Sequence, residues 1–286
     1  MLMLESVTMN EGLNLYTFLG GRELRWGRKT YIMGILNITT DSFSGDGVGK
    51  DMETALARAK RLVAEGADII DIGGESTRPD SRPVTPEEEI NRVLPVIKML
   101  SSEVDVPISI DTYKSGVARL ALEAGANMIN DVWGLRQDPE LAHVAAERGV
   151  PLVITANQRD MQYDNIMTAV VDSLVVGMNL ALDAGVAWGN IIIDPGIGFG
   201  KTLEGNLEVL RRLRELKSLG RPILLGTSRK SMIGLVLDLP VDERLEGTAA
   251  TVALGIANGA DIIRVHDVLQ MRRVATMADV IVRGTR

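Results

Sequence analysis

The chain has 286 residues, of which 45% are hydrophobic and 24% are charged, and it contains no cysteine. This length and apolar content allow a large buried core and exclude a disordered chain, and the missing cysteine excludes disulfides, a thiolate nucleophile and a zinc–sulfur site. The formal net charge of −7 and the lack of a basic run argue against a nucleic-acid-binding protein. With no signal-peptide pattern and no apolar run of membrane-spanning length, we expect a cytoplasmic protein with no membrane partner.

Residues 1–30 are mixed in character, and we expect an N-terminal extension or hairpin there. From residue 31 to residue 286 the chain repeats one plan, in which an apolar strand ends in polar residues and a helix follows. The expected strands are 31–36, 67–72, 107–110, 127–129, 151–154, 191–193, 222–225 and 261–263. The expected helices include 52–65, 139–147 and 165–184, one that begins at Pro86, one that runs to Ala124, one that begins near Leu203, and a terminal helix.

Eight such units without a linker predict a single (βα)8 TIM barrel rather than an open doubly wound sheet. Periodicity alone leaves the open sheet as an alternative. In a barrel the polar strand ends gather on one rim, where enzymes of this fold keep their active sites. The residues expected on that rim are Asn37, Asp111, Asn130, Asp194, Lys230, Arg264 and His266, joined by Thr77 and Arg78 from a loop.

The rim residues fall into two chemical groups. One group offers acceptors, with amide donors from Asn130, for the edge of a flat, nitrogen-rich heterocycle, and it consists of Asp111, Asn130 and Asp194. The other group offers mainly donors for phosphate or diphosphate, and it consists of Arg264, His266, Arg78, Thr77 and Asn37. A site with both groups would bind a heterocycle that carries a phosphorylated leaving group.

Some of these signals have a simpler structural explanation. Asp111 stands where a helix N-cap would stand, and Lys230 is compatible with a solvated charge. Lys230 nevertheless follows a buried strand in a Gly-Thr-Ser turn, where a helix N-terminus favours anion binding. His266 lies beside Asp267 and is compatible with a surface residue, although its place at the last strand end favours a function. His143, within an expected helix, is expected to be structural.

The segment GIGFGKT resembles a phosphate-binding loop in composition only. A Walker A motif needs glycine where Pro195 stands, and a dinucleotide fingerprint needs glycine where Lys201 stands. Neither nucleotide motif is present. We expect the glycines to shape the turn or to let a ligand approach the backbone.

Seven segments of the chain resemble the signature segments of the dihydropteroate synthase family, and they occur in the same order as in that family. They read MGILNITTDSFSGDG, DIGGESTRPDSRPVTPEEE, ISIDT, NDV, DPGIGFGKTLEGN, GTSRKSMIG and RVHDV. The resemblance implies a (βα)8 fold, usually homodimeric, that uses Mg2+ in folate biosynthesis. It implies an enzyme that joins 6-hydroxymethyl-7,8-dihydropterin diphosphate to p-aminobenzoate, with release of diphosphate, and that sulfonamides inhibit.

The resemblance also implies a role for each matching residue. The pterin-binding residues would be Asp111, Asn130, Asp194, Phe199 and Lys230. The diphosphate would bind Asn37, Thr77, Arg264 and His266, with Asn37 also the metal ligand, and p-aminobenzoate would bind Phe43, Thr77, Arg78, Pro79 and Ser231. In the implied SN1-like mechanism diphosphate departs first, and the arylamine attacks the pterin methide cation. The residues implied in catalysis are Asp111, Asp194, Lys230, Arg264 and His266.

The sequence departs from the family pattern at two places. Thr155 and Ala156 stand where the family has a Met-His pair, and Trp133 stands where a small residue is usual. These changes are compatible with neutral drift, a reshaped pocket or a loss of activity. The alternatives are therefore a catalytically silent pterin-binding barrel, and a pterin-binding methyltransferase acting on a reduced folate and a corrinoid protein. The methyltransferase would not need the diphosphate residues that this sequence retains.

Overall fold

The computed structural model describes residues 16–38, 48–76 and 82–284, and eight parallel strands form its sheet. The strands are β3 (Tyr31–Asn37), β4 (Ile69–Gly73), β5 (Ile108–Asp111), β6 (Met128–Asp131), β7 (Leu152–Thr155), β8 (Ile191–Asp194), β9 (Leu224–Leu225) and β10 (Ile262–Val265). Their order is β8-β7-β6-β5-β4-β3-β10-β9. The two ends of this order meet, because Ile193 bridges Ile223 and donates its N–H to the Pro222 carbonyl at 3.0 Å. The expected (βα)8 barrel is confirmed, and the open sheet is excluded.

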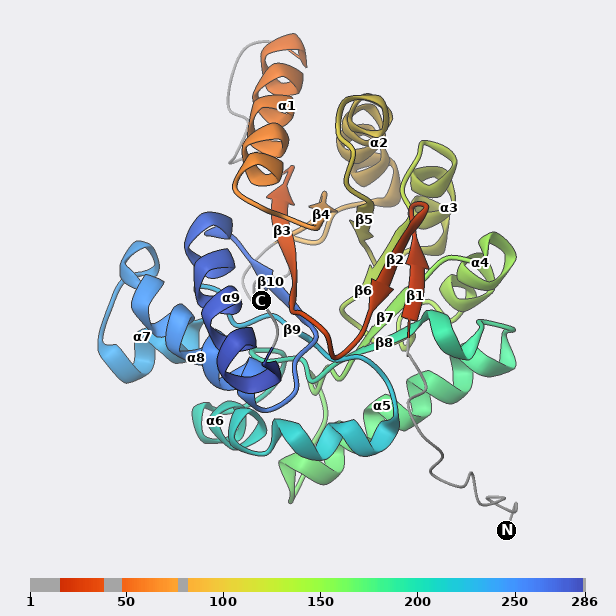
Figure 1. Ribbon diagram of the computed structural model, residues 1–286. Helices are drawn as coiled ribbons and strands as arrows, with labels where there is room; N and C mark the ends of the chain where they lie inside the picture. Colours follow the sequence, from red (N-terminus) through yellow and green to blue (C-terminus); the bar gives the residue numbers. More distant parts are fainter. Residues whose placement is uncertain (1–15, 39–47, 77–81, 285–286) are drawn as a thin grey trace.

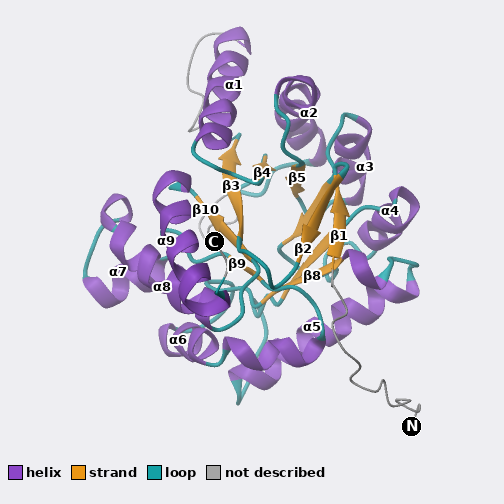
Figure 2. Cartoon of the chain, viewed as in Figure 1, coloured by secondary structure: helices purple, strands orange, loops and turns teal. Residues whose placement is uncertain are grey.

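The helices form a ring outside the strands (Figure 1, Figure 2). They are α1 (Val48–Ala64), α2 (Pro86–Glu103), α3 (Ser115–Glu123), α4 (Glu140–Arg148), α5 (Ile166–Asp183), α6 (Leu203–Arg211), α7 (Ser231–Leu237), α8 (Leu245–Ala257) and α9 (Val268–Arg283). Simple alternation predicts one helix between β9 and β10, but the structure has two, α7 and α8. Asp238 ends α7 in a left-handed conformation, and Pro240 follows it, so the chain turns before α8.

The start of α2 shows how the sequence sets a helix boundary. Thr85 accepts a hydrogen bond from the Glu88 N–H at 3.2 Å, and the Glu88 carboxylate accepts one from the Thr85 N–H at 3.4 Å. This reciprocal pair, with Pro86 at the first helical position, satisfies backbone donors that the helix itself leaves unpaired. The helix therefore begins at Pro86, as the sequence predicts.

An antiparallel hairpin covers one end of the barrel. Its strands are β1 (Tyr16–Leu19) and β2 (Arg22–Arg25), and Figure 1 shows it in front of the barrel strands. Leu19 and Leu24 pack into the barrel interior with residues such as Met33 and Ile192. The hairpin therefore closes the amino-terminal end of the barrel and leaves the opposite rim for function.

The barrel interior has an apolar layer and a polar layer. The apolar layer lies under the hairpin and includes Met33, Ile69, Met128, Val153, Ile192, Leu224 and Ile262. Because side chains alternate along a strand, the residue two positions later on each strand also faces inward. Those positions hold Ile35, Asp71, Asn130, Thr155, Asp194, Gly226 and Arg264. The barrel thus carries its polar groups in one layer near the carboxyl ends of the strands.

One described helix, α5, is apolar and long enough to cross a membrane by length and composition alone. Its inner face, however, packs on the barrel. A side chain on Gly177 would place Cβ 2.5 Å from the Ile154 side chain of β7. The helix is therefore part of the outer layer of the barrel, and its composition is no evidence for a membrane span.

Candidate active site

An arginine between two carboxylates forms the centre of the polar layer. Arg264 donates from Nε to Asp71 Oδ2 at 2.5 Å, and from Nη2 to Asp111 Oδ2. Asn130 also donates from Nδ2 to Asp71 Oδ2, at 3.1 Å. Although burial opposes the charge of Arg264, the two carboxylates raise the pKa of its guanidinium. One network therefore joins the two expected halves of the site. Asn130 and Asp111 were expected to bind the ring, and Arg264 was expected to bind the anion.

Asp111 serves this network and not a helix. Helix α3 begins at Ser115 with Lys114 as its N-cap, and the Ser115 N–H donates to Asp138 Oδ2 at 2.8 Å, so the capping explanation for Asp111 is wrong. Burial raises the pKa of the Asp111 carboxyl to about 7, while Arg264 lowers it and Asp71 raises it. A carboxyl group poised near neutral pH inside a barrel rim is typical of a functional site.

Asp194 ends β8 beside a turn that only glycine can form. Its Oδ1 accepts the Gly196 N–H at 2.7 Å, and Gly196 has a φ of +69°. A Cβ at Gly196 would lie 2.0 Å from the carbonyl oxygen of Ala156. The turn therefore passes against the end of β7, and this close approach holds the Asp194 carboxylate in place. Burial raises the pKa of Asp194.

Phe199 and Lys230 lie together near this carboxylate. The Lys230 ammonium is 4.1 Å from the centre of the Phe199 ring, a cation–π contact. Burial lowers the pKa of Lys230 to about 8; the Arg264 charge lowers it further, whereas Asp194 and Asp111 raise it. The resemblance implies that both residues bind the pterin ring, and the structure brings them into contact.

The imidazole and the backbone N–H of His266 both form hydrogen bonds with Ser228. Its backbone N–H donates to Ser228 Oγ at 3.2 Å, and the same hydroxyl lies 3.0 Å from its Nδ1. A hydroxyl that accepts from the backbone can donate its own proton to Nδ1, which places the imidazole proton on Nε2. Burial, with Arg264 and Arg229 nearby, lowers the pKa of His266 to about 4, so the ring is a neutral donor at pH 7.

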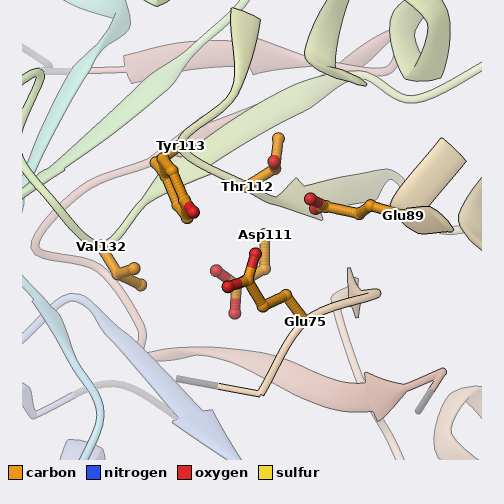
Figure 3. Close-up of a pocket in the computed structure, with 6 residues that line it drawn as sticks. All are labelled: Glu75, Glu89, Asp111, Thr112, Tyr113 and Val132. Carbon is orange, nitrogen blue, oxygen red and sulfur yellow. The ribbon is translucent and has the colours of Figure 1, made fainter. Parts of the chain in front are cut away.

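A small acidic pocket adjoins Asp111 (Figure 3). Its lining residues are Glu75, Glu89, Asp111, Thr112, Tyr113 and Val132. Lys114 pairs with Glu75 and with Glu89, at 2.5 Å in each case. Burial raises the pKa of Glu89, while its pairing with Lys114 lowers it. This second buried network ties the end of β4 to α2 and to the segment after β5.

The comparisons with known proteins agree with this geometry. Residues 33–266 match the model of the family described as pterin binding enzyme. A dihydropteroate synthase of Clostridium beijerinckii is 54% identical over 266 residues, which are 93% of this chain and 99% of that protein. The chain belongs to the dihydropteroate synthase family.

Solved structures of dihydropteroate synthases share the fold. The enzyme of Clostridium difficile, solved in the presence of pteroic acid, has a TM-score of 0.88 at 53% identity and covers 90% of this chain and 98% of that chain. The enzyme of Xanthomonas albilineans, solved with 4-aminobenzoic acid, has a TM-score of 0.89 at 40% identity. The match covers 94% of this chain and 98% of that chain.

The remaining residues that the dihydropteroate synthase resemblance implies are only partly covered by the structure. Four of them lie outside the described residues, namely Phe43, Thr77, Arg78 and Pro79. Ser231 is exposed at the first position of α7, directly after Lys230. Asn37 ends β3, and its Oδ1 would lie 3.8 Å from a Cβ built on Gly73, while Asp111 Oδ2 would lie 3.6 Å from it. Asn37 and Asp111 therefore border the same glycine.

The departures from the dihydropteroate synthase pattern lie along one wall. Thr155 and Ala156 are buried at the end of β7, and the Ala156 N–H donates to the Asp194 carbonyl at 2.9 Å. Trp133 lies 5.6 Å from the Arg159 guanidinium, which lies 5.2 Å from the Phe199 ring. The tryptophan thus continues the stack of cations and rings that begins at Lys230. Nothing in the structure explains why small residues replace the Met-His pair.

Two residues at the centre of the site were not predicted from the sequence. Asp71 is buried in mid-strand and joins Arg264 to Asn130. The Lys201 ammonium donates to the carbonyls of Ala156 and Gly196 at 2.8 Å, and to that of Phe199 at 3.3 Å. The signal for Asp71 was available, because a carboxylate two positions after the inward Ile69 must also face inward. The role of Lys201 depends on the turn conformation, which no sequence pattern specified.

Proposed function

We propose that this chain acts as a dihydropteroate synthase, which joins 6-hydroxymethyl-7,8-dihydropterin diphosphate to p-aminobenzoate and releases diphosphate. The observation that carries the proposal is the polar layer of the barrel. In that layer carboxylates that suit the pterin ring and an arginine that suits the diphosphate share hydrogen bonds. A substrate with a flat ring and an anionic tail matches this arrangement.

In this proposal the pterin ring binds Asp111, Asn130, Asp194 and Lys230, with Phe199 beside it. The ring presents N–H groups to carboxylates and ring nitrogens to donors. The Asn130 amide turns its Nδ2 toward Asp71, so its Oδ1 is available as an acceptor. Lys230 supplies an ammonium within a buried site, where a charge-assisted hydrogen bond is stronger than it is in water.

The diphosphate binds Arg264, His266 and Asn37. Arg264 uses Nε and Nη2 for Asp71 and Asp111, and in the described part of the chain its Nη1 has no hydrogen-bond partner. That edge of the guanidinium and Nε2 of His266 are donors for phosphate oxygens. His266 acts as a neutral donor, because its lowered pKa keeps it uncharged near neutral pH.

The residues present fit a magnesium ion that the substrate brings. The Asn37 amide oxygen is a hard ligand, and Gly73 leaves room between it and Asp111. Magnesium usually keeps several waters and binds proteins through one or two oxygens together with substrate phosphates. Asn37 would hold the ion, which would neutralise negative charge on the leaving diphosphate.

The protein's part in the reaction is charge stabilisation. As the bond between the pterin methylene carbon and the diphosphate oxygen breaks, Arg264 and His266 stabilise the departing anion. Asp111 and Asp194 stabilise the positive charge on the pterin until the amine of p-aminobenzoate attacks the methylene carbon. Preorganised groups of this kind are each worth roughly 3–4 kcal/mol at a transition state. No covalent enzyme intermediate is needed.

The p-aminobenzoate site lies toward the start of α7. Ser231 is exposed there, and its hydroxyl would bind the carboxylate of the substrate. Phe43, Thr77, Arg78 and Pro79 would complete this site, as the resemblance implies, and sulfonamides would compete there. Thr77 would also contact the diphosphate.

We also propose that the protein is a cytoplasmic homodimer. Large apolar side chains are exposed on the neighbouring helices α7, α8 and α9, and they include Leu235, Leu254, Met277 and Ile281. Exposed apolar area of this kind on adjacent elements is typical of an interface between subunits. Sedimentation of the purified protein tests this assignment.

A turnover assay tests the proposed function. Purified protein with the pterin diphosphate, p-aminobenzoate and magnesium should form one dihydropteroate for each diphosphate released. Pterin binding without turnover would favour the silent barrel. Methyl transfer from a reduced folate to a corrinoid protein, without condensation, would favour the methyltransferase.

A further inference from the structure

Asp71 is a buried carboxylate inside the barrel. It lies in the middle of β4 with no exposed surface, between Ile35 of β3 and Ser109 of β5 in the sheet register. Its neighbours Ile70 and Ile72 belong to the core between barrel and helices. Asp71 therefore faces the barrel interior, one layer above the apolar plug formed with Ile69.

From that position one oxygen of Asp71 contacts a residue from each half of the site. Its Oδ2 accepts from Arg264 Nε at 2.5 Å and from Asn130 Nδ2 at 3.1 Å. The three residues come from β4, β6 and β10, so the contacts cross the barrel interior. A single carboxylate thus fixes both the plane of the arginine and the orientation of the asparagine amide.

The remaining oxygen of Asp71, Oδ1, takes part in neither of these contacts. Among the described residues Oδ1 is buried and has no hydrogen-bond partner. An unpaired buried acceptor costs stability, and a buried ion pair often contributes no net stability compared with apolar residues of the same volume. Folding alone therefore gives no reason for a carboxylate here.

We propose that Asp71 is a positioning residue of the active site, which aims the Arg264 guanidinium at the diphosphate and the Asn130 amide oxygen at the pterin ring. This inference rests on the proposed function, because it assigns Arg264 to the leaving group and Asn130 to the ring. Asp71 itself touches neither substrate. It acts through the two side chains that it holds.

The variant Asp71→Asn tests this role, because it removes the charge with almost no change in shape. The amide oxygen can take the place of Oδ2, but it carries no negative charge, so the hydrogen bonds from Arg264 and Asn130 lose their charge-assisted strength, and Nδ2 places a donor where the carboxylate has Oδ1. The affinities for inorganic diphosphate with magnesium and for 6-hydroxymethylpterin should each fall about 10- to 100-fold, the size expected when hydrogen bonds to a charged group are lost. Calorimetric titration measures both affinities.

The direction of the diphosphate effect separates positioning from simple charge. Removing a negative charge near an anion site would by itself strengthen anion binding. Weaker diphosphate binding in Asp71→Asn therefore supports the positioning role, and unchanged or tighter binding overturns it.

A matched control is Asp261→Asn. Asp261 is also fully buried, directly before β10, where its carboxylate accepts from Lys217 at 2.9 Å and from the Ile223 N–H at 3.1 Å. It lies at the opposite end of the barrel from the polar layer. The control should lower thermal stability and leave both affinities unchanged. If Asp71→Asn behaves in the same way, the role of Asp71 is structural and the proposal is wrong.

A double-variant cycle shows whether Asp71 acts through Arg264. In an Arg264→Ala background, Asp71→Asn should cause no further loss of diphosphate affinity, because the side chain that it positions is gone. Additive losses would overturn the proposal. If Asp71→Asn does not fold, Asp71→Ser replaces it, and both affinities should fall, because the serine hydroxyl is shorter than the carboxylate and uncharged. Retention of both affinities would overturn the proposal.

The wild-type protein separates this inference from the proposed function. If the wild type releases diphosphate and dihydropteroate together while Asp71→Asn is unimpaired, only the role of Asp71 is wrong. If the wild type does not turn over, the proposed function fails first.

Discussion

The substitution Gly196→Ala tests whether the close approach between the turn after β8 and the end of β7 positions Asp194. Gly196 has a φ of +69°, in the left-handed region that costs an alanine roughly 1–2 kcal/mol. Its new Cβ would lie 2.0 Å from the Ala156 carbonyl oxygen, whereas ordinary contacts begin at 3.4 Å. The turn or the strand end must therefore move by more than about 1 Å.

That movement displaces the Asp194 carboxylate, because its Oδ1 accepts the Gly196 N–H at 2.7 Å. A misplacement of about 1 Å at a reacting site can cost about 100-fold in rate. We therefore expect kcat/KM for the pterin diphosphate to fall about 100-fold in Gly196→Ala. Steady-state kinetics and thermal unfolding on the same preparation measure this effect.

Gly149→Ala is the matched control. Gly149 ends α4 with a φ of +63°, and a Cβ there would meet nothing within 4 Å. It carries the same backbone strain without the close approach, so it should lose roughly 1–2 kcal/mol of stability and no activity. If the two variants have equal kcat/KM, the turn does not position Asp194 and the reasoning is refuted.

Two further predictions follow from the buried charges. The pH profile of kcat/KM should be bell-shaped. Activity should rise as the pH increases through about 7, where Asp111 ionises, and fall as the pH increases through about 8, where Lys230 loses its proton. A flat profile from about pH 6 to about 9.5 would contradict this assignment. Lys201→Met should destabilise the fold by roughly 1–3 kcal/mol and lower kcat/KM about tenfold. The Ala156 carbonyl loses its donor, while the Gly196 and Phe199 carbonyls keep only their backbone donors. Thermal unfolding and turnover measure the effect, and unchanged turnover would show that the turn keeps its shape without the lysine.

The sequence predicted the fold well because each strand carries its own signal. Short runs of branched residues such as those of β8 end in polar residues, and every run expected as a strand has a strand within or overlapping it. The pair of helices α7 and α8 was not predicted, because the turn at Asp238 requires a left-handed residue that glycine usually marks. The N-terminal hairpin was expected only as one of two possibilities.

The site was predicted where a residue stands at a strand end and missed where it stands inside a strand or a turn. Asp111 and Asp194 were found because polar residues interrupt the apolar pattern at the rim. Asp71 was missed because it reads as part of the β4 strand, although alternation from Ile69 turns it inward. The three carbonyl contacts of Lys201 arise from the tertiary path of the glycine turn, which local sequence does not encode.

The most direct test of the two-part site compares the affinities for 6-hydroxymethylpterin diphosphate and for 6-hydroxymethylpterin itself. The ratio of the two affinities isolates what the diphosphate contributes. In Arg264→Ala or His266→Ala the ratio should fall about tenfold or more. The affinity for the alcohol should stay near wild type in His266→Ala, whereas Arg264→Ala also removes the partner of Asp111 and lowers that affinity. In Asp194→Ala both affinities should fall together and the ratio should persist. If the ratio changes equally in all three variants, the protein does not divide its site between a ring half and an anion half, and the account is contradicted.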